Sequence, residues 1–416
     1  MRNSLINKIK WWSAVGIVMA VAAGIYSPMA SAHGEKSQPA FMRMRTIQWY
    51  NLKWSTDKLK VNDEMTVTGN FHVFEGWPET IAKPETAFLN IGIPGPVFVR
   101  TESYLGDGKD MKLAQRSVSL ELNRDYEFKV VLKARRPGRW HVHTMVNVEG
   151  GGPIIGPGKW VEIEGQMADF KSNITTLTGQ TIDIETYGLG GVVRWHLFWY
   201  IVGIAWLWWW FRRPSLLPRW NRVTAGQEEG LITDTDKKAG IAFAAATLLI
   251  VLFGYTSANS EYPIAIPLQA GVLGYMTPLP KDESVSVAVE RAEYRVPGRQ
   301  MSMALRVTNN SDAPVSLGEF QCGAIRFMNA SVMKDESNYP ENILAEEGLQ
   351  VEDNNAIQPG ETRTLKVTAT DAAWENERMA DLIYDPDSRF GGMVHFVGGG
   401  KKHSISIGGP IIPVFG

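Results

Sequence analysis

Three kinds of hydrophobic pattern follow one another along the chain. Residues 33–170 and 283–416 alternate apolar and polar positions, which predicts half-buried strands. Residues 192–211 and 239–256 are almost continuously apolar and close to the length that crosses a bilayer. We therefore expect a mostly β protein, in which two β domains are joined by two transmembrane helices.

The first β region contains one strongly periodic segment, Glu64 to Val73. Its apolar residues, Met65, Val67, Phe71 and Val73, fall on one side. Further strands are predicted at 88–91, 97–100, 117–122, 126–134 and 140–148. The sequence Arg136-Pro137-Gly138-Arg139 is typical of a tight turn, so we expect residues 126–134 and 140–148 to form a hairpin. Many short strands separated by Pro and Gly indicate a β-sandwich or small barrel.

The second β region, 283–416, has the same character. Strand patterns begin at Val285 and at Met301, and a third includes Leu365 and Val367. Asn, Asp, Pro and Gly clusters separate them. A second sandwich is the simplest interpretation.

The two apolar runs predict membrane spans, 192–211 and 239–256. Six tryptophans in the first resemble an interfacial aromatic belt. The loop 212–238 is rich in cations, namely Arg212, Arg213, Arg219, Arg222, Lys237 and Lys238. The positive-inside rule places this loop in the cytoplasm and both β domains outside. His196 is assigned nothing beyond a subunit contact.

Residues 1–32 have the form of a cleaved signal peptide. A basic start and an apolar run precede the small residues Ala30-Ser31-Ala32. Cleavage there makes His33 the new N-terminus. The alternative is an uncleaved anchor, for which the apolar run is short.

An N-terminal histidine offers a metal two nitrogens, its α-amine and its ring Nδ1. His141 and His143 are two residues apart on a predicted strand and therefore project from one face. Three residues supplying four nitrogens suit copper, so we predict a copper site at His33, His141 and His143. The alternative is that His141 and His143 are ordinary polar strand residues. His72 is interpreted as a plain surface or hydrogen-bonded strand histidine.

Composition excludes several other functions. A net charge of −2 gives no reason to expect a nucleic-acid partner. One cysteine excludes an internal disulfide framework, and Cys322 is expected to be buried. It precedes His395 and His403 by too many residues to favour a blue-copper site. We find no nucleotide-binding loop, nucleophile elbow or zinc-protease motif on a plausible framework.

Several stretches carry a family resemblance, namely HGEKSQPAFMRMRTIQWY from His33, FHVFEGWPET at 71–80, KARRPGRWHVHTM at 133–145, GGGPIIGPGKW at 150–160 and YDPDSRFGG at 384–392. They resemble the copper-bearing B subunits of particulate methane monooxygenases, over essentially the whole mature chain. The resemblance implies two cupredoxin-like domains and a copper ion held by His33, His141 and His143. It also implies the membrane-embedded A and C subunits as partners, in a trimer of three-subunit protomers. The location implied is a bacterial inner or intracytoplasmic membrane, with both β domains on the periplasmic (lumenal) side.

One position departs from that pattern. Some family members carry histidine where this chain has Gln48, and an amide is a poor copper ligand. A second metal in this domain is therefore not expected. The second β domain lacks copper ligands, which implies a structural or assembly role.

The implied activity is the oxidation of methane to methanol with O2. The copper is the oxidation centre, an electron relay or a structural ion, and the sequence does not choose among them. Two alternatives are kept, an ammonia monooxygenase B subunit and a membrane-tethered periplasmic copper carrier.

Overall fold

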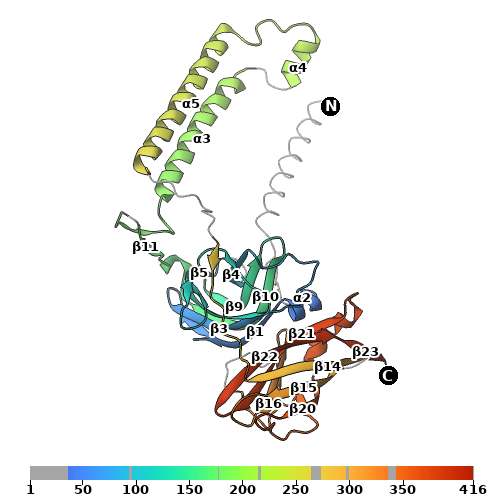
Figure 1. Cartoon of the computed structure of the whole chain (residues 1–416). Helices are drawn as coiled ribbons and strands as arrows, with labels where there is room; N and C mark the ends of the chain where they lie inside the picture. The colour runs from blue at the N-terminus through green and yellow to red at the C-terminus, as the bar shows by residue number, and fades with distance from the viewer. Residues whose placement is uncertain are drawn as a thin grey trace. The chain divides into compact units, whose positions relative to one another are not determined.

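The structure, a computed structural model, describes residues 36–92, 96–176, 178–213, 217–263, 273–296, 299–335 and 343–415. The predicted signal peptide and His33 lie outside these residues. The chain forms two compact units. The first comprises the described parts of Met1–Asp169 and Leu273–Gly416, and the second those of Phe170–Val272. The prediction of a mostly β chain is confirmed (Figure 1).

Alternating burial along β3 (Glu64–Val73) shows how the first sandwich forms. Met65, Val67, Phe71 and Val73 are fully buried, as the sequence predicted. One sheet has the strand order β1 (Ile47–Trp54), β3, β8 (Arg124–Ala134), β5 (Phe98–Gly106), β6 (Lys112–Leu113). The other has the order β13 (Gly274–Tyr275), β7 (Val118–Ser119), β4 (Ala87–Gly92), β9 (Gly138–Val148), β10 (Gly152–Glu164), β2 (Lys58–Lys60). Their apolar faces share one core, to which strands of both sheets contribute buried side chains.

The predicted hairpin between residues 126–134 and 140–148 is wrong. β8 pairs with β3 and β5, whereas β9 pairs with β4 and β10 in the other sheet. The chain bends at Arg136 and enters β9 at Gly138, so this segment carries it from one sheet to the other. Turn residues specify a change of direction and leave the choice of partner strand to packing.

The second sandwich is built in the same way from two five-stranded sheets. One has the order β19 (Leu349–Val351), β20 (Thr362–Thr370), β15 (Gln300–Asn309), β14 (Val285–Val296), β23 (Ile412–Phe415). The other has the order β18 (Leu344–Ala345), β17 (Ile325–Met328), β16 (Ser316–Cys322), β21 (Arg389–Gly398), β22 (Lys401–Pro410). Cys322 is buried in this core, as expected. Burial also raises the pKa of its thiol.

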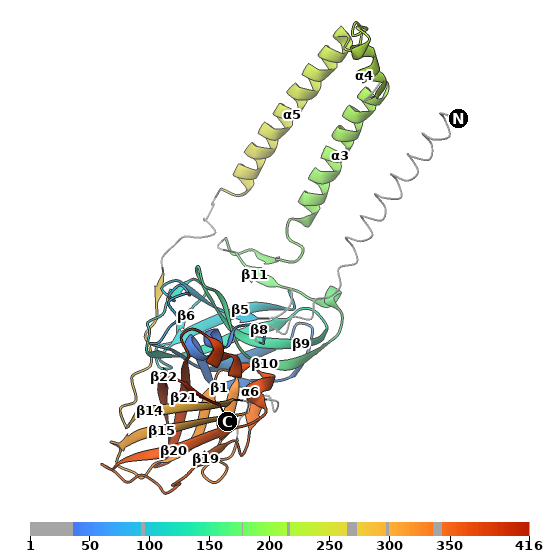
Figure 2. The same cartoon turned by 90° about the vertical axis from the view of Figure 1, so that its right-hand side faces the viewer.

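Short helices border the sandwiches. They are α2 (Ala40–Arg45), the 3₁₀ turns η1 (Met167–Asp169) and η3 (Met379–Tyr384), and α6 (Ala373–Asn376). Arg43 of α2 is buried, and its Nη1 lies 3.3 Å from Oε2 of Glu377. The other carboxylate oxygen of Glu377, Oε1, forms an ion pair with Nζ of Lys36 at 2.9 Å. These pairs tie the start of the described chain to the segment that follows α6, and Figure 2 shows α6 beside the strands of the second sandwich.

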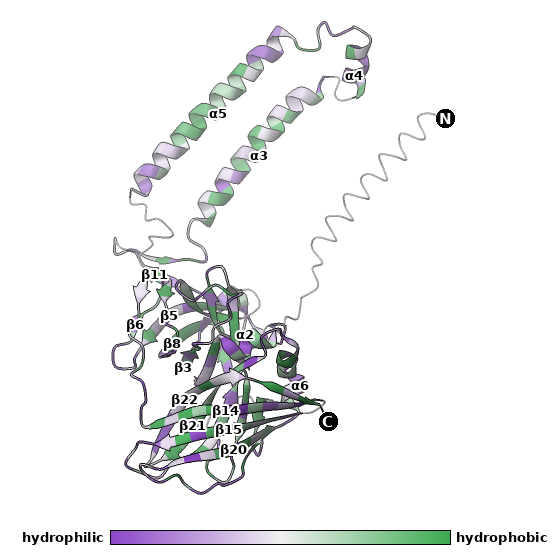
Figure 3. Ribbon diagram, turned by 45° about the vertical axis from the view of Figure 1, so that its right-hand side comes forward, coloured by the Kyte–Doolittle hydropathy of each residue, from purple (hydrophilic) through white to green (hydrophobic). Residues whose placement is uncertain are grey.

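The second unit is a pair of long helices, α3 (Leu189–Phe211) and α5 (Asp234–Glu261), joined through the shorter α4 (Leu217–Thr224). A small ribbon, β11 (Asn173–Thr175) with β12 (Thr181–Asp183), precedes them. Among the described helices, only α5 is long and apolar enough to cross a membrane by length and composition. Tryptophans, Arg194 and His196 make α3 less apolar, so only one of the two predicted spans passes this criterion. Figure 3 shows the apolar middle of α5 between hydrophilic ends.

Candidate metal centre

The two candidate ligands of β9 lie side by side. The ring centroids of His141 and His143 are 4.2 Å apart, and the rings meet edge to face at 77°. Val142 between them is fully buried in the core of the first sandwich, so both histidines project from the opposite face of the sheet. The spacing predicted from sequence is therefore confirmed for this pair.

A bulge in β10 supports the ring of His143. The register between β9 and β10 shifts between Ile155 and Gly158, which places Gly158 opposite His143. A Cβ atom at Gly158 would lie 2.7 Å from Nδ1 of His143. Real Cβ atoms do not come that close, so only glycine leaves room for the ring here.

The carbonyl of Gly156 orients the same ring. Nδ1 of His143 lies 3.0 Å from that oxygen. A carbonyl only accepts hydrogen bonds, so Nδ1 carries the proton and Nε2 carries the lone pair. This is the arrangement in which a metal-binding histidine is fixed by a hydrogen bond from its other nitrogen. His143 is 5% exposed, so the neighbouring packing also restrains it.

A tryptophan covers His141. Trp160 is the direct partner of His141 across the β9–β10 pair. Their ring centroids are 4.9 Å apart and the planes differ by 25°, which is a stacked contact. The guanidinium of Arg139 lies 4.7 Å from the centroid of the Trp160 ring, on which it forms a cation–π contact. Trp160 is nevertheless 45% exposed, so the stack borders solvent.

These supporting residues were not predicted from sequence. Gly156, Gly158 and Trp160 entered only as part of a matching motif, and β10 was not predicted as a strand. The signal that was available is the sequence Gly156-Pro157-Gly158, since glycine within a strand marks a bulge or a close approach.

Gln38 attaches the start of the described chain to β10. Its Oε1 accepts the backbone N–H of Ile155 at 2.9 Å, and its Nε2 donates to the carbonyl of Pro153. Gln38 is five residues from His33 in the sequence and is bound beside the bulge that supports His143. Nothing in the residue pattern pointed to this role.

The third predicted ligand, His33, lies outside the described residues. Within the ranges that the structure describes, no group of three or more His, Cys, Asp or Glu side chains could hold a metal. The chemistry of the donors nevertheless fits copper, because two imidazoles are already adjacent and one is oriented through Nδ1.

Gln48, the position that departs from the family pattern, is occupied by hydrogen bonds to backbone carbonyls. Nε2 of Gln48 donates to the carbonyls of Gly323, at 2.8 Å, and Trp49. Its partner across the strands is His72, whose Nδ1 lies 3.1 Å from Oδ2 of Asp125. His72 is therefore a buried histidine with a carboxylate partner. Of the two interpretations from sequence, the hydrogen-bonded strand histidine is confirmed.

The comparisons agree with the family resemblance. A family model for the B-subunit protein of monooxygenases matches residues 34–415. The chain belongs to this family of monooxygenase B subunits.

One relative is similar over nearly the full length of both chains. The particulate methane monooxygenase alpha subunit of Methylococcus capsulatus (Bath) is 55% identical over 416 residues, which cover 99% of this chain and 100% of the relative. Among solved structures, the cupredoxin domain of amoB from Nitrosocaldus yellowstonii is 16% identical and covers 32% of this chain and 96% of that domain, with a TM-score of 0.24. The periplasmic chaperone SfaE is also 16% identical, over 31% of this chain and 56% of the chaperone, with a TM-score of 0.16. Scores this low support no inference about fold.

Proposed function

We propose that this chain is the copper-binding B subunit of a particulate methane monooxygenase, a membrane complex that oxidises methane to methanol. The observation that supports this most directly is the His141–His143 pair, which β10 orients through the Gly156 carbonyl, the gap at Gly158 and the Trp160 ring. The named relative supports methane as the substrate.

The third ligand in this proposal is His33, through its α-amine and ring. Gln38 is held on β10, and the five residues back to His33 span at most about 18 Å of extended chain. A new N-terminus at His33, exposed by cleavage after Ala32, is therefore in reach of this part of the sheet.

The reaction consumes methane, O2, two electrons and two protons, and yields methanol and water. Copper held by His33, His141 and His143 would supply one-electron redox chemistry. The chain itself contributes orientation: Gly156 sets the tautomer of His143, and Trp160 limits rotation of His141. This copper acts as the oxidation centre, as an electron relay or as a structural ion.

The proposal includes a membrane assembly. Residues 1–32 are a cleaved signal peptide, α3 and α5 both cross the membrane, and both β domains, 33–170 and 283–416, lie on its periplasmic (lumenal) side. The two domains are cupredoxin-like, and the second has no copper. The membrane-embedded A and C subunits are the partners, in a trimer of three-subunit protomers. The charged 212–238 loop and the 28-residue length of α5 support this topology.

Two other functions are less well supported. The named relative favours methane over ammonia as the substrate. A copper carrier should release its metal readily, whereas the supports around His141 and His143 favour retention.

The test is intact mass, N-terminal sequencing and metal analysis of the membrane-extracted complex. We expect a chain that begins at His33, bound copper and two copurifying membrane subunits. The matched variant is His141→Ala with His143→Ala, which should lose copper and methane oxidation together while the complex remains assembled. His72→Ala, outside the proposed ligand set, is the control and should retain copper.

Two outcomes contradict the proposal. A chain that still begins at Met1 has no free amine on His33, so the proposed chelate cannot form. Unchanged copper content and unchanged methane oxidation in the double variant would show that His141 and His143 hold no required metal.

A further inference from the structure

The short helix α4, between the two long helices, has an exposed apolar face. Leu217, Trp220 and Val223 recur every three residues and so lie on one side of the helix. They are 74%, 66% and 46% exposed. The opposite side carries Pro218 and Arg222, so α4 is strongly amphipathic.

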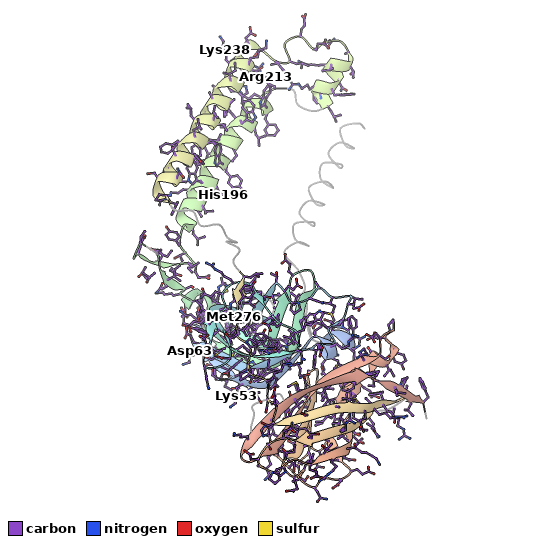
Figure 4. The ribbon with its side chains drawn as sticks, viewed as in Figure 1. Lys53, Asp63, His196, Arg213, Lys238 and Met276 are labelled. Carbon is purple, nitrogen blue, oxygen red and sulfur yellow. The ribbon has the colours of Figure 1, made fainter. Side chains whose placement is uncertain are left out.

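Side-chain contacts hold α4 beside the ends of α3 and α5. The guanidinium of Arg219 lies 5.6 Å from the ring centroid of Trp210 in α3, and it donates to the carbonyl of Leu231 just before α5. Arg213 and Trp209 both donate to the Asp236 carboxylate, at 3.1 Å, which closes the same end of the helix pair. Figure 4 shows Arg213 and Lys238 at this end and His196 nearer the other.

The cations at this end favour an anionic surface. Arg212 stacks over Trp209 at 4.2 Å, and Arg219 over Trp210, so these cations stand among aromatic rings. Neither they nor Arg222 form an ion pair within the residues that the structure describes. Arginine beside tryptophan is typical of the level of lipid headgroups.

The length of α5 puts α4 at that level. Its 28 residues extend roughly 42 Å at 1.5 Å per residue, beyond a hydrocarbon core of about 30 Å. The end of α5 near α4 therefore reaches the headgroup region when α5 spans the bilayer.

We propose that α4 is an interfacial helix that binds the cytoplasmic surface of an anionic bilayer. Leu217, Trp220 and Val223 enter the boundary between headgroups and acyl chains, and Arg212, Arg219 and Arg222 contact lipid phosphates. This inference rests on the membrane topology proposed above but does not depend on the copper site.

The sequence suits a site-directed labelling experiment, because its single cysteine, Cys322, is buried. We would attach a nitroxide to Trp220→Cys in the whole complex, reconstituted in phosphatidylcholine nanodiscs with and without phosphatidylglycerol. Pro218→Cys on the opposite face is the matched control, and the unsubstituted complex measures labelling of other thiols. Power saturation compares access of dissolved oxygen, which partitions into lipid, with access of a water-soluble nickel chelate.

We expect the label at position 220 to be reached severalfold better by oxygen than by nickel, and the label at 218 to show the reverse. Phosphatidylglycerol should deepen the label at 220, and Arg212→Gln with Arg222→Gln should abolish that dependence.

Three results overturn the proposal. If nickel reaches position 220 freely, the apolar face lies in water. If neither reagent reaches it, a partner subunit covers the face. If the membrane depth of the label at position 220 changes neither with phosphatidylglycerol nor with the arginine substitutions, anionic headgroups do not bind α4. A label at Ile204→Cys, midway along α3, tests the membrane topology separately. If the nickel chelate reaches position 204, α3 does not span the membrane and the topology itself is wrong.

Discussion

Single atoms decide whether the His143 ring can be held where it is. Gly158→Ala would place a methyl group 2.7 Å from Nδ1 of His143, so either the ring or β10 must move. We expect copper occupancy to fall sharply, with a stability cost of about 1–3 kcal/mol from overpacking. Metal analysis beside thermal unfolding measures both. The control is Gly76→Ala, where the added carbon meets nothing within 4 Å. Full copper content in the Gly158 variant would show that the ring position is not required.

The Trp160 ring is the second contact that we expect to govern copper binding. Trp160→Ala removes the ring stacked on His141, whereas Trp160→Phe keeps a smaller one. Stacked aromatic pairs contribute about 0.5–1.5 kcal/mol, so copper affinity should weaken roughly two- to tenfold in the alanine variant and less in the phenylalanine variant. Competition with a copper chelator measures the affinity, and electron paramagnetic resonance of Cu(II) should change with it. Equal affinity in all three proteins would contradict a positioning role for the ring.

The histidine pair could be predicted from sequence, but its supports could not. The alternation along residues 140–148 places His141 and His143 on one face, whichever strands pair with them. Gly158 and Trp160 matter only because a register shift sets them opposite His143 and His141. Register between strands is a tertiary property, since it depends on which strands pair and where a bulge occurs.

Local sequence patterns also did not predict which strands pair with one another. Periodicity located β3 correctly, because one of its faces is fully buried. The sequence predicted a tight turn at Arg136–Arg139, whereas the chain bends at Arg136, β9 begins at Gly138, and β8 and β9 belong to different sheets. β10 was missed because Gly152, Pro153, Gly156, Pro157 and Gly158 interrupt its pattern. The family resemblance carried information about this segment that residue chemistry alone did not.

The helix α2 depends on one buried ion pair. Arg43→Met removes the buried cationic partner of the Glu377 carboxylate and leaves it only the more exposed ammonium of Lys36. Loss of one partner of a buried pair costs about 3–5 kcal/mol, so we expect a clear fall in melting temperature. Arg45→Met is the control, because its partner Asp387 is largely exposed and such pairs contribute at most about 1 kcal/mol. Adding Glu377→Gln to Arg43→Met should restore part of the stability. An equal effect of the two arginine variants would contradict this account.

The two sandwiches meet across a buried polar cluster. Glu319 of β16 accepts hydrogen bonds from Arg326, at 2.5 Å, and from Lys402, at 3.4 Å. Lys402 also donates to Asn51 of the first sandwich. Burial alone would raise the pKa of the Glu319 carboxyl, but the surrounding cations outweigh it and hold that pKa well below its usual range. The contact between the domains is therefore sensitive to charge.

His395 makes that contact sensitive to pH. It lies opposite Glu319 on β21, its Nδ1 is 2.9 Å from Oγ of Ser404, and its ring centroid is 5.8 Å from that of Tyr50. Burial, reinforced by Lys402 and Arg326 and opposed by Glu319, lowers its pKa to about 3. The unfolded chain binds this proton near its ordinary pKa of about 6.5. Between those two pH values the unfolded state holds more protons, so stability is fully present above about 6.5 and is lost as pH falls.

The loss should approach about 1.4 kcal/mol per pH unit once pH is below the ordinary histidine pKa. Melting temperature of the detergent-extracted complex between pH 7 and pH 5 measures it, in a range above the ordinary pKa of Glu, about 4.3. His395→Gln cannot titrate and should flatten the slope, while His196→Gln, in the separate helical unit, should leave it unchanged. If melting temperature falls with pH as steeply in His395→Gln as in the unsubstituted protein, another group is responsible for the pH dependence. A flattened slope would place the acid sensitivity of the paired sandwiches on a single neutral imidazole between them.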